Sequence, residues 1–330
     1  LSFFFFKAKL GDKHFWLRSN LSNVWSQFFD SALFMVIAFY GVYPTPVLIR
    51  IIITWWLFNV AMGFVYTPLS YLGQTASRYM TMDVRAIRTR VFREGDDLVA
   101  FILAHVPELK DGSILAVTSK IVALAEGRTA VVKNKKEKEA LIKKESDWAL
   151  QTHPEWWWTA KDGALLVNAG IDESNAGEKL ILLPKDSFKT AATLRNQLIS
   201  LYKVKRLGVV ITDSRISPMR AGVTGMAIGH AGFRGVRDYR GKEDLFGRKL
   251  KVTMTDVADS LATVATLVMG EGSERQPLAI IEDLPAGRQV RLIEFTNKPV
   301  DPKEVQISAK DDMYRPLFRN VRIQRPKRRE

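Results

Sequence analysis

The chain shows two contrasting patterns of hydrophobic and polar residues. Between positions 28 and 43 the only charged residue is Asp30, and between positions 47 and 66 the only one is Arg50. Each stretch approaches the length of about 20 apolar residues that a helix needs to cross a bilayer. Pro44-Thr45-Pro46 supplies a turn between them, and Trp and Tyr residues lie near the ends, as is typical of membrane interfaces. This pattern predicts a two-helix membrane hairpin at residues 28–71, within a transporter-like segment 1–80, with a buried hairpin in a soluble core as the alternative.

The charges around this hairpin predict its orientation. Basic residues flank both outer ends, from Lys7 to Arg18 and from Arg78 to Arg93, whereas only Arg50 lies near the turn. Because positive residues are retained on the cytoplasmic side, both ends are expected in the cytoplasm. We therefore expect a protein of the inner (cytoplasmic) membrane with residues 81–330 in the cytoplasm, or a cytoplasmic protein if the N-terminal segment is not a physiological part of it.

After Met82 the pattern is that of a globular domain. Short apolar runs predict strands, and periodic apolar positions predict helices. The expected strands are 84–91, 113–119, 164–167 and 207–212, and the expected helices are 98–105, 133–144 and 255–269. This mixture predicts an α+β domain over residues 81–330.

Composition narrows the chemistry. The chain has no Cys, so a disulfide framework, a thiol nucleophile and a zinc finger are excluded. The net charge of +14 should attract anions such as nucleotides, polyglutamate, nucleic acid or anionic lipid. Neither the Walker A spacing nor the dinucleotide glycine spacing is present in the glycine-rich stretch 222–242, which excludes both established nucleotide loops there.

Carboxylates follow two of the expected strands. Residues 168–175, which follow the expected strand 164–167, combine Asp172 and Glu173 with two amides and a hydroxyl. Asp213 follows the expected strand 207–212. Because Mg²⁺ prefers oxygen ligands, the two aspartates predict a shared metal site if strands 164–167 and 207–212 lie side by side. The alternatives are a polar turn, with Asp172 or Ser174 capping a helix, and a second helix cap at Asp213.

Further residues fit the same chemistry. The helix 255–269 leads into Gly270-Glu271-Gly272-Ser273-Glu274, which offers a third acid beside flexible backbone amides. A guanidinium matches a carboxylate bidentately, so a substrate carboxylate could bind one or more of five arginines: Arg215, Arg220, Arg234, Arg237 and Arg240.

The ordered motifs resemble one family. They are Glu94-Gly95-Asp96-Asp97, Ser119-Lys120, Glu126-Gly127-Arg128, residues 168–175, Asp213-Ser214, Arg220, Asp244, Val257-Ala258-Asp259 and Met269-Gly270-Glu271-Gly272. Together they make residues 82–320 similar to the coenzyme F-420 gamma-glutamyl ligase family. Asp213-Ser214-Arg215 with Pro218 resembles the branch named for folate metabolism gamma-glutamate ligases.

This resemblance implies a mixed-sheet gamma-glutamyl ligase domain that forms a homodimer. It further implies a ligase that adds L-glutamate in amide linkage to a carboxylate acceptor, folate-like or a coenzyme F-420 precursor, through an acyl-phosphate. GTP or ATP would be the co-substrate and Mg²⁺ or Mn²⁺ the cofactor. The implied metal ligands are Asp172, Asp213, Ser214 and Glu271, of which the three acids are the candidate catalytic residues. The implied nucleotide contacts are Ser119, Lys120, Asn175, Gly270, Gly272, Ser273 and Glu274. Arg215 and Arg220 are the candidate carboxylate ligands.

The apolar segment carries a second resemblance. Ser26-Gln27, Asp30-Ser31, Phe34, Ala38-Phe39, Thr67-Pro68 and Tyr71 make residues of about 18–80 similar to the last two spans of the VUT family of queuosine precursor transporters. Two helices cannot enclose a transport path by themselves.

Other function classes stay open at this stage. The basic tail from Arg319 to Arg329 and the net charge of +14 would also suit a membrane-associated protein that binds RNA or anionic lipid. However, no RNA-binding motif with interleaved aromatic residues is present, so no nucleic-acid partner is expected. A passive partner of queuosine precursor transporter subunits is the third class.

Overall fold

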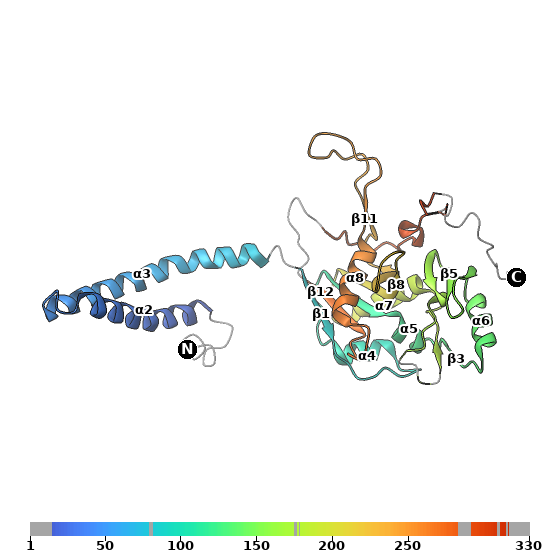
Figure 1. Cartoon of the computed structure of the whole chain (residues 1–330), viewed down its shortest axis with the longest axis horizontal. Helices are drawn as coiled ribbons and strands as arrows, with labels where there is room; N and C mark the ends of the chain where they lie inside the picture. The colour runs from blue at the N-terminus through green and yellow to red at the C-terminus, as the bar shows by residue number, and fades with distance from the viewer. Residues whose placement is uncertain are drawn as a thin grey trace. The chain divides into compact units, whose positions relative to one another are not determined.

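The structure is a computed structural model that describes residues 15–78, 82–174, 177, 179–282, 292–308, 311–314 and 316; within the helices, the side chains of residues 15–23, 65 and 67–78 are outside the description. The chain forms two compact units, Leu1–Met80 and Thr81–Glu330, whose helices and strands are labelled in Figure 1. Each unit is described by itself.

The N-terminal unit contains two long helices, α2 (Phe15–Phe39) and α3 (Thr45–Arg78). Pro46 lies in the first turn of α3, where its missing N–H breaks no helical hydrogen bond. The helices contact each other through Trp56, whose indole Nε1 donates to the Val24 carbonyl at 3.0 Å and whose ring meets Phe28 edge-on at 5.5 Å. The predicted pair of helices is therefore present, and both helices are longer than the apolar stretches that predicted them.

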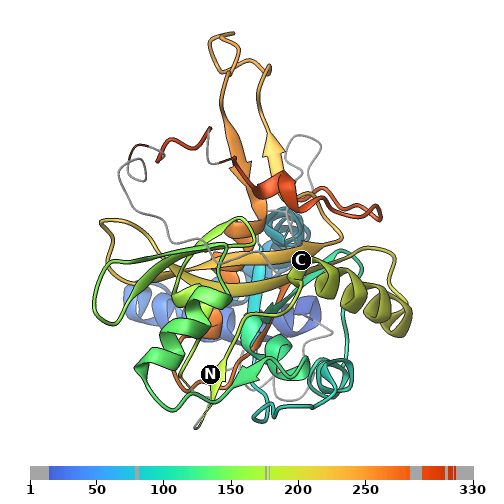
Figure 2. The ribbon, with the colours of Figure 1, turned by 90° about the vertical axis from the view of Figure 1, so that its right-hand side faces the viewer.

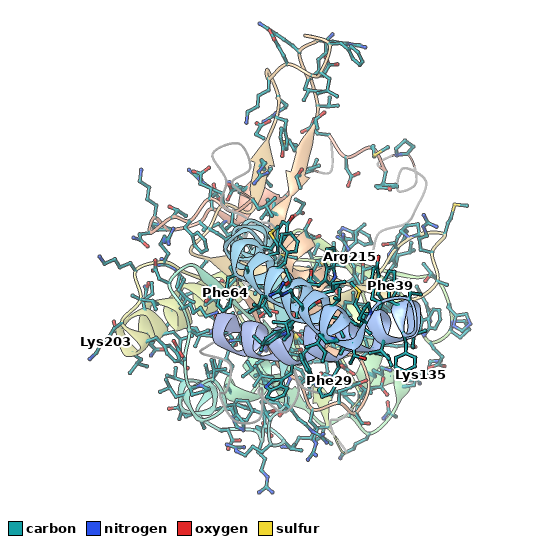
Figure 3. All side chains as sticks on the ribbon, turned by 90° about the vertical axis from the view of Figure 1, so that its left-hand side faces the viewer. Phe29, Phe39, Phe64, Lys135, Lys203 and Arg215 are labelled. Carbon is teal, nitrogen blue, oxygen red and sulfur yellow. The ribbon has the colours of Figure 1, made fainter. Side chains whose placement is uncertain are left out.

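The surface of this unit is unusually apolar. Phe29 and Phe64 are more than half exposed, and Figure 3 shows them on the two helices. Within the described residues, only Thr45–Phe64 of α3 is long and apolar enough to cross a membrane, because the apolar part of α2, Val24–Phe39, is shorter. One of the two predicted spans thus meets the length requirement, and the membrane hairpin as a whole stays a prediction.

The second unit is built on a five-stranded mixed sheet. In spatial order its strands are β1 (Asp83–Ile87), β12 (Leu278–Glu282), β2 (Ser113–Thr118), β8 (Leu207–Ile216) and β9 (Val223–Ala231). β2 and β8 run parallel, and the other three neighbouring pairs are antiparallel. The predicted α+β class with a mixed sheet is confirmed.

Helices cover both faces of this sheet. One face packs against α4 (Leu98–His105), α5 (Ser119–Ala125) and α7 (Ser187–Tyr202), and the other against α8 (Val257–Met269). Successive side chains of a strand point to opposite faces, so Leu115 and Val117 of β2 enter the first core whereas Ile114 and Ala116 enter the second. This two-sided burial explains why β2 and β8 are continuous apolar runs.

Three smaller sheets complete the unit. β4 (Trp148–Gln151), β5 (Trp157–Lys161) and β6 (Ala164–Val167) form an antiparallel sheet behind α6 (Lys135–Lys144), and β3 (Thr129–Ala130) pairs with β7 (Leu180–Ile181). β10 (Val236–Asp238) and β11 (Met254–Asp256) form an arm that stands clear of the main sheet in Figure 2. The short 3-10 helices are Asn168–Gly170 and Pro302–Val305. The prediction that strands 164–167 and 207–212 are neighbours is wrong, because β6 belongs to a different sheet from β8.

One buried residue makes the stability of this unit dependent on pH. His230 of β9 is 1% exposed and its ring lies between Phe188 at 5.4 Å and Phe233 at 4.9 Å. Neither ring nitrogen has a hydrogen-bond partner among the described residues. Burial lowers the pKa of His230 to about 4, because the charged imidazolium is disfavoured in an apolar site.

Protonation of His230 should therefore favour unfolding. Its pKa is lower in the folded chain than in the unfolded one, so its contribution is intact above pH 6.5 and is lost as the pH falls towards 4. At pH 4.5 the expected loss is about 2.5 kcal/mol. Urea unfolding at pH 7.5 and pH 4.5 should show this loss in the wild type and in the exposed control His153→Phe, and a correspondingly smaller one in His230→Phe. Equal losses in all three proteins would contradict it.

Candidate active site

The parallel pair β2–β8 positions the first group of candidate residues. Thr118 pairs with Thr212, so Ser119, which begins α5, lies beside Asp213. The Ser119 hydroxyl donates to Asp213 Oδ1 at 3.1 Å. β8 does not end at Thr212 as the sequence predicts but continues to Ile216 after a register shift at Ile211/Thr212. Asp213 is therefore a strand residue at an irregular point of the ladder, and the helix-cap alternative is excluded.

Asp213 is a carboxylate in a poorly solvated position. Burial, and to a smaller degree the negative charge of Asp172, raise the pKa of Asp213 to about 7, although the Ser214 N–H and the Ser119 hydroxyl oppose this rise. A buried carboxylate without a cationic partner is unstable as the anion. The position thus favours either a proton or a nearby cation at neutral pH.

Asp172 approaches the same region from a loop. It follows β6 and the 3-10 helix Asn168–Gly170, and its backbone bridges to Ile181 of β7. Asp172 Oδ1 accepts from the Ser174 N–H at 2.6 Å, while Oδ2 lies 2.7 Å from the ammonium of Lys120. Burial raises the pKa of Asp172, but Lys120 and Ser174 together hold it below its ordinary value.

Lys120 thus connects the two acids. Its ammonium also donates to the Ser174 hydroxyl at 3.1 Å, and its charge opposes the rise of the pKa of Asp213. Ser119 and Lys120, adjacent in α5, contact Asp213 and Asp172 respectively. The sequence prediction that these two aspartates come together is supported, although a loop rather than a neighbouring strand delivers Asp172.

The third acid comes from the end of α8. Glu271 Oε1 accepts at 2.6 Å from the hydroxyl of Ser214, the residue directly after Asp213. Gly270, with φ of 79°, reverses the chain there, as glycine does readily. The Glu274 carboxylate folds back over this turn and accepts from the Gly272 N–H at 2.8 Å.

These oxygens match a hard divalent cation in kind, because carboxylates and hydroxyls are its preferred ligands. In the described part of the chain, however, no three Asp, Glu or His side chains converge as a metal cluster. Asp172 faces Lys120, and Glu271 faces Ser214. The raised pKa of Asp213 is compatible with a proton or a cation at this place.

Of the two predicted carboxylate ligands, Arg215 lies further along β8 and Arg220 lies in the turn that follows this strand. Arg215 Nη1 forms an ion pair with Asp259 Oδ2 at 3.0 Å, and its buried Nε has no hydrogen-bond partner among the described residues. Arg215 and Arg220 both line a cavity of about 640 Å³. The other three arginines of the predicted set contact other side chains: Arg240 pairs with Asp238, Arg234 with Glu304, and Arg237 contacts Tyr239.

Sequence reasoning missed two parts of this region. In the sequence, Asp259 is noted only as one residue of a family motif. In the structure it forms the ion pair with Arg215 and accepts from the Ala227 N–H at 2.9 Å. The run of three tryptophans divides in the structure: Trp156 is exposed, Trp157 is buried in a small core, and Trp158 lines the cavity. The alternation of a strand is the signal that separates them. Asn175 and the basic tail 319–329 lie outside the described residues.

Comparison with known proteins defines the family. The family model described as F420-0:Gamma-glutamyl ligase matches residues 86–283, more than half of the chain. The coenzyme F420:L-glutamate ligase of Archaeoglobus fulgidus is 38% identical over 211 residues, which cover 59% of this chain and 84% of that protein. The chain belongs to the F420-0:gamma-glutamyl ligase family, as its motifs predicted.

Two further relatives extend the match. The coenzyme F420:L-glutamate ligase of Methanopyrus kandleri is 37% identical over 213 residues, covering 59% of this chain and 84% of that protein. That of Methanococcus maripaludis is 31% identical over 254 residues, covering 71% of this chain and 97% of that protein. Residues 1–73 match a different family model, described as "Putative vitamin uptake transporter", which confirms the second resemblance.

The contact between Lys120 and Asp172 can be tested by titration. In Lys120→Met the pKa of the Asp172 carboxyl should rise, because burial then acts without the ammonium that opposes it. Carbon-13 chemical shifts of labelled aspartate, followed against pH in the metal-free protein, measure this pKa. Lys138→Met is the matched control, since Lys138 pairs with the neighbouring Glu173 and should leave it unchanged. An Asp172 pKa that is the same in Lys120→Met and the wild type would contradict the contact.

Proposed function

We propose that this chain is a gamma-glutamyl ligase that uses GTP or ATP and Mg²⁺ or Mn²⁺. It joins L-glutamate in amide linkage to an acceptor carboxylate, on a coenzyme F420 precursor or a folate-like acid. The observation that carries this proposal is the grouping of Ser119, Lys120, Asp172 and Asp213 around the C-terminal end of β2. The names of the relatives support the glutamate and the F420-type acceptor.

The reaction we propose has two bond-forming steps. First, the terminal phosphoryl group passes to the acceptor: a carboxylate oxygen bonds to phosphorus, and the bond from phosphorus to the nucleoside diphosphate breaks. The amine of glutamate, having lost a proton from its ammonium form, then attacks the acyl carbon. A carbon–nitrogen bond forms, the carbon–oxygen bond to phosphate breaks, and inorganic phosphate leaves. The amide bond is thus driven by the nucleotide.

Asp172, Asp213, Ser214 and Glu271 would hold the divalent cation. When bound, the cation offsets negative charge on the phosphates and on the transferring group. The side chain of Asp213 is preset for this role, since its burial makes the anion unstable without a positive charge. Occupancy would require Asp172 to exchange its Lys120 contact, and Glu271 its Ser214 contact, for shared ligation.

Lys120 and the turn after α8 would bind the nucleotide. Once a cation neutralises Asp172, the Lys120 ammonium is available to a phosphate oxygen. Ser119, Gly270, Gly272, Ser273 and Glu274 are the further proposed contacts. Because the Glu274 carboxylate already accepts from the Gly272 N–H, an anionic phosphate could bind that N–H only if Glu274 turned away. Arg215 and Arg220 would bind substrate carboxylates.

The activity is tested directly by product formation. The protein should convert L-glutamate and an acceptor, offered with GTP or ATP and Mg²⁺ or Mn²⁺, to a product heavier by one glutamate residue in mass spectrometry. Omission of nucleotide or metal should abolish it. Light scattering of the same preparation measures whether the proposed homodimer forms; the arm β10–β11, with Leu245 and Phe246 almost fully exposed at its tip, supports that proposal.

Asp213→Asn separates a catalytic from a structural role. The substitution keeps the shape of the side chain and removes the charge, so product formation and Mn²⁺ affinity should fall at least tenfold. The thermal midpoint of the metal-free protein at pH 8 should stay the same or rise, because an unfavourable buried charge is gone. The control Asp111→Asn weakens the contact of Asp111 with Arg206 and should lower the midpoint while folded protein stays active. Retained activity in Asp213→Asn would end the catalytic assignment.

We also propose that α2 and α3 associate with a membrane, with the ligase unit in the cytoplasm. The match of residues 1–73 to a transporter family and the apolar stretch Thr45–Phe64 support this. Deletion of residues 1–80 should move the protein from the detergent phase to the aqueous phase in a phase-partition assay, with ligase activity preserved. The proposal fails if the truncated and full-length proteins partition alike.

A further inference from the structure

Three consecutive residues shortly before Asp172 have a left-handed backbone. Asn168, Ala169 and Gly170 have φ of 51°, 58° and 69°, whereas the residues on either side of them are extended. Glycine adopts this conformation readily, and asparagine tolerates it better than most residues with a Cβ. Ala169 has no such tolerance, and it is 0% exposed. A buried alanine persists in the left-handed region only where its surroundings hold it there.

Thr159 of β5 holds this left-handed turn. Its side chain is 0% exposed, and its hydroxyl accepts from the Ala169 N–H at 2.8 Å while it donates to the Leu166 carbonyl at 2.7 Å. The Ala169 N–H is a buried donor, which would be costly to leave without an acceptor. Asn168 also bonds to β5, because its Oδ1 accepts from the Trp157 N–H at 2.8 Å. These bonds fasten the left-handed turn to the small sheet β4–β5–β6.

The end of the turn is packed closely, and it leads directly to Asp172. A Cβ on Gly170 would lie 2.7 Å from Leu183 Cγ, so a larger residue there would have to displace Leu183. The backbone of Asp172 exchanges two hydrogen bonds of 2.9 Å with Ile181 of β7. Because a single residue separates Gly170 from Asp172, the backbone of Asp172 is fixed between the left-handed turn and β7.

The fixed backbone sets the place of the Asp172 carboxylate. Its Oδ1 accepts from the Ser174 N–H at 2.6 Å, and its Oδ2 lies 2.7 Å from the ammonium of Lys120. The side chain of aspartate is short, so a displaced backbone would carry the carboxylate away from Lys120. The geometry of the turn therefore decides whether Asp172 reaches the candidate site.

We infer that Thr159 is a positioning residue for the reaction: through Ala169 it holds the left-handed turn that sets the place of the Asp172 carboxylate. The inference rests on the proposed function, in which Asp172 binds the cation, and adds to it a residue of β5 that acts from outside the site. Groups that orient a metal ligand through hydrogen bonds change metal affinity or activity about 10- to 100-fold when they are replaced. A Thr159 that only stabilised the small sheet would leave metal affinity unchanged.

Replacing the hydroxyl tests this inference. Thr159→Val keeps the shape of the side chain and removes the acceptor of the Ala169 N–H, whereas Thr159→Ser keeps the hydroxyl. In the full chain in detergent micelles, Mn²⁺ affinity and product formation should both fall about tenfold in Thr159→Val and stay within about twofold of the wild type in Thr159→Ser. Electron paramagnetic resonance of free Mn²⁺ measures the affinity. Ser146→Ala is the matched control: it removes another buried hydroxyl, which bonds to the Ile142 carbonyl at 2.6 Å, and should leave Mn²⁺ affinity unchanged.

Hydrogen exchange gives a readout that needs no metal. The amides of Asp172 and Ile181 bond to each other's carbonyls, so their exchange reports whether the backbone of Asp172 is held. In metal-free Thr159→Val both amides should exchange about tenfold faster than in the wild type. In Thr159→Ser and Ser146→Ala they should exchange at the wild-type rate. Mass spectrometry with fragmentation to single residues measures these rates.

Gly170→Ala is the second variant, which decides the matter should Thr159→Val fail to fold. It forces the turn against Leu183 without changing Thr159, so it should also lower Mn²⁺ affinity about tenfold. Its control is Gly112→Ala, because Gly112 has φ of 87° but the added Cβ would lie 3.7 Å from Arg206, an ordinary contact. The inference is overturned if folded Thr159→Val or folded Gly170→Ala binds Mn²⁺ as the wild type does. It is likewise overturned if Thr159→Ser loses as much affinity as Thr159→Val.

The outcomes also separate this inference from the proposed function. Suppose that the wild type binds no Mn²⁺ and forms no product, while the amides of Asp172 and Ile181 exchange faster in Thr159→Val. That result would support the hold of Thr159 on the Asp172 backbone and refute the ligase. Product formation at the wild-type rate in folded Thr159→Val would support the ligase and refute Thr159 as a positioning residue.

Discussion

The parallel pairing of β2 with β8 is the constraint on which the candidate site depends. It sets Thr118 opposite Thr212, and the residues that follow each, Ser119 and Asp213, then meet. Both strands are buried on two sides, so a slip of their register would move apolar side chains to the wrong face. The core that stabilises the sheet therefore also fixes the distance between α5 and the carboxylate. The irregular pairing at Ile211/Thr212 is tolerated where the chain changes from core to polar side chains.

The polar groups of the candidate site are arranged in pairs whose contacts a ligand could replace. Lys120 holds Asp172, Ser214 holds Glu271, and Glu274 holds the Gly272 N–H. The contact of Lys120 with Asp172 is partly exposed, and those of Glu271 and Glu274 are exposed. A contact to a cation or to a phosphate could replace each of these contacts and would satisfy the same polar group. Asp213 is the exception, because the described residues around it supply hydroxyl and amide donors but no direct ion pair.

Periodicity and turn chemistry were enough to predict several elements of the second unit, although α7, β9 and β12 were not among them, and ordered motifs were enough to predict the family. Leu98–His105 and the strand at Ser113 appear as the pattern indicates. The neighbour of a strand within its sheet could not be predicted in the same way. Nothing local in Ala164–Val167 tells that it joins β5 rather than β8, since short apolar runs look alike in any sheet. The contact of Lys120 with Asp172 spans loops whose path depends on the whole fold. Its partners could be named from motifs, but their pairing could not.

The edge of the sheet has a consequence for how the domain is made. β1 and β12 are neighbours, and Arg85 reaches the buried Glu282 at 2.8 Å across 197 positions of sequence. A ribosome delivers β1 long before β12, so the sheet stays incomplete until nearly the whole domain has been synthesised. Contacts of such long range slow folding, and helices α2 and α3 will have formed much earlier. Completion of the main sheet is therefore tied to the synthesis of β12, which comes after most of the domain has left the ribosome.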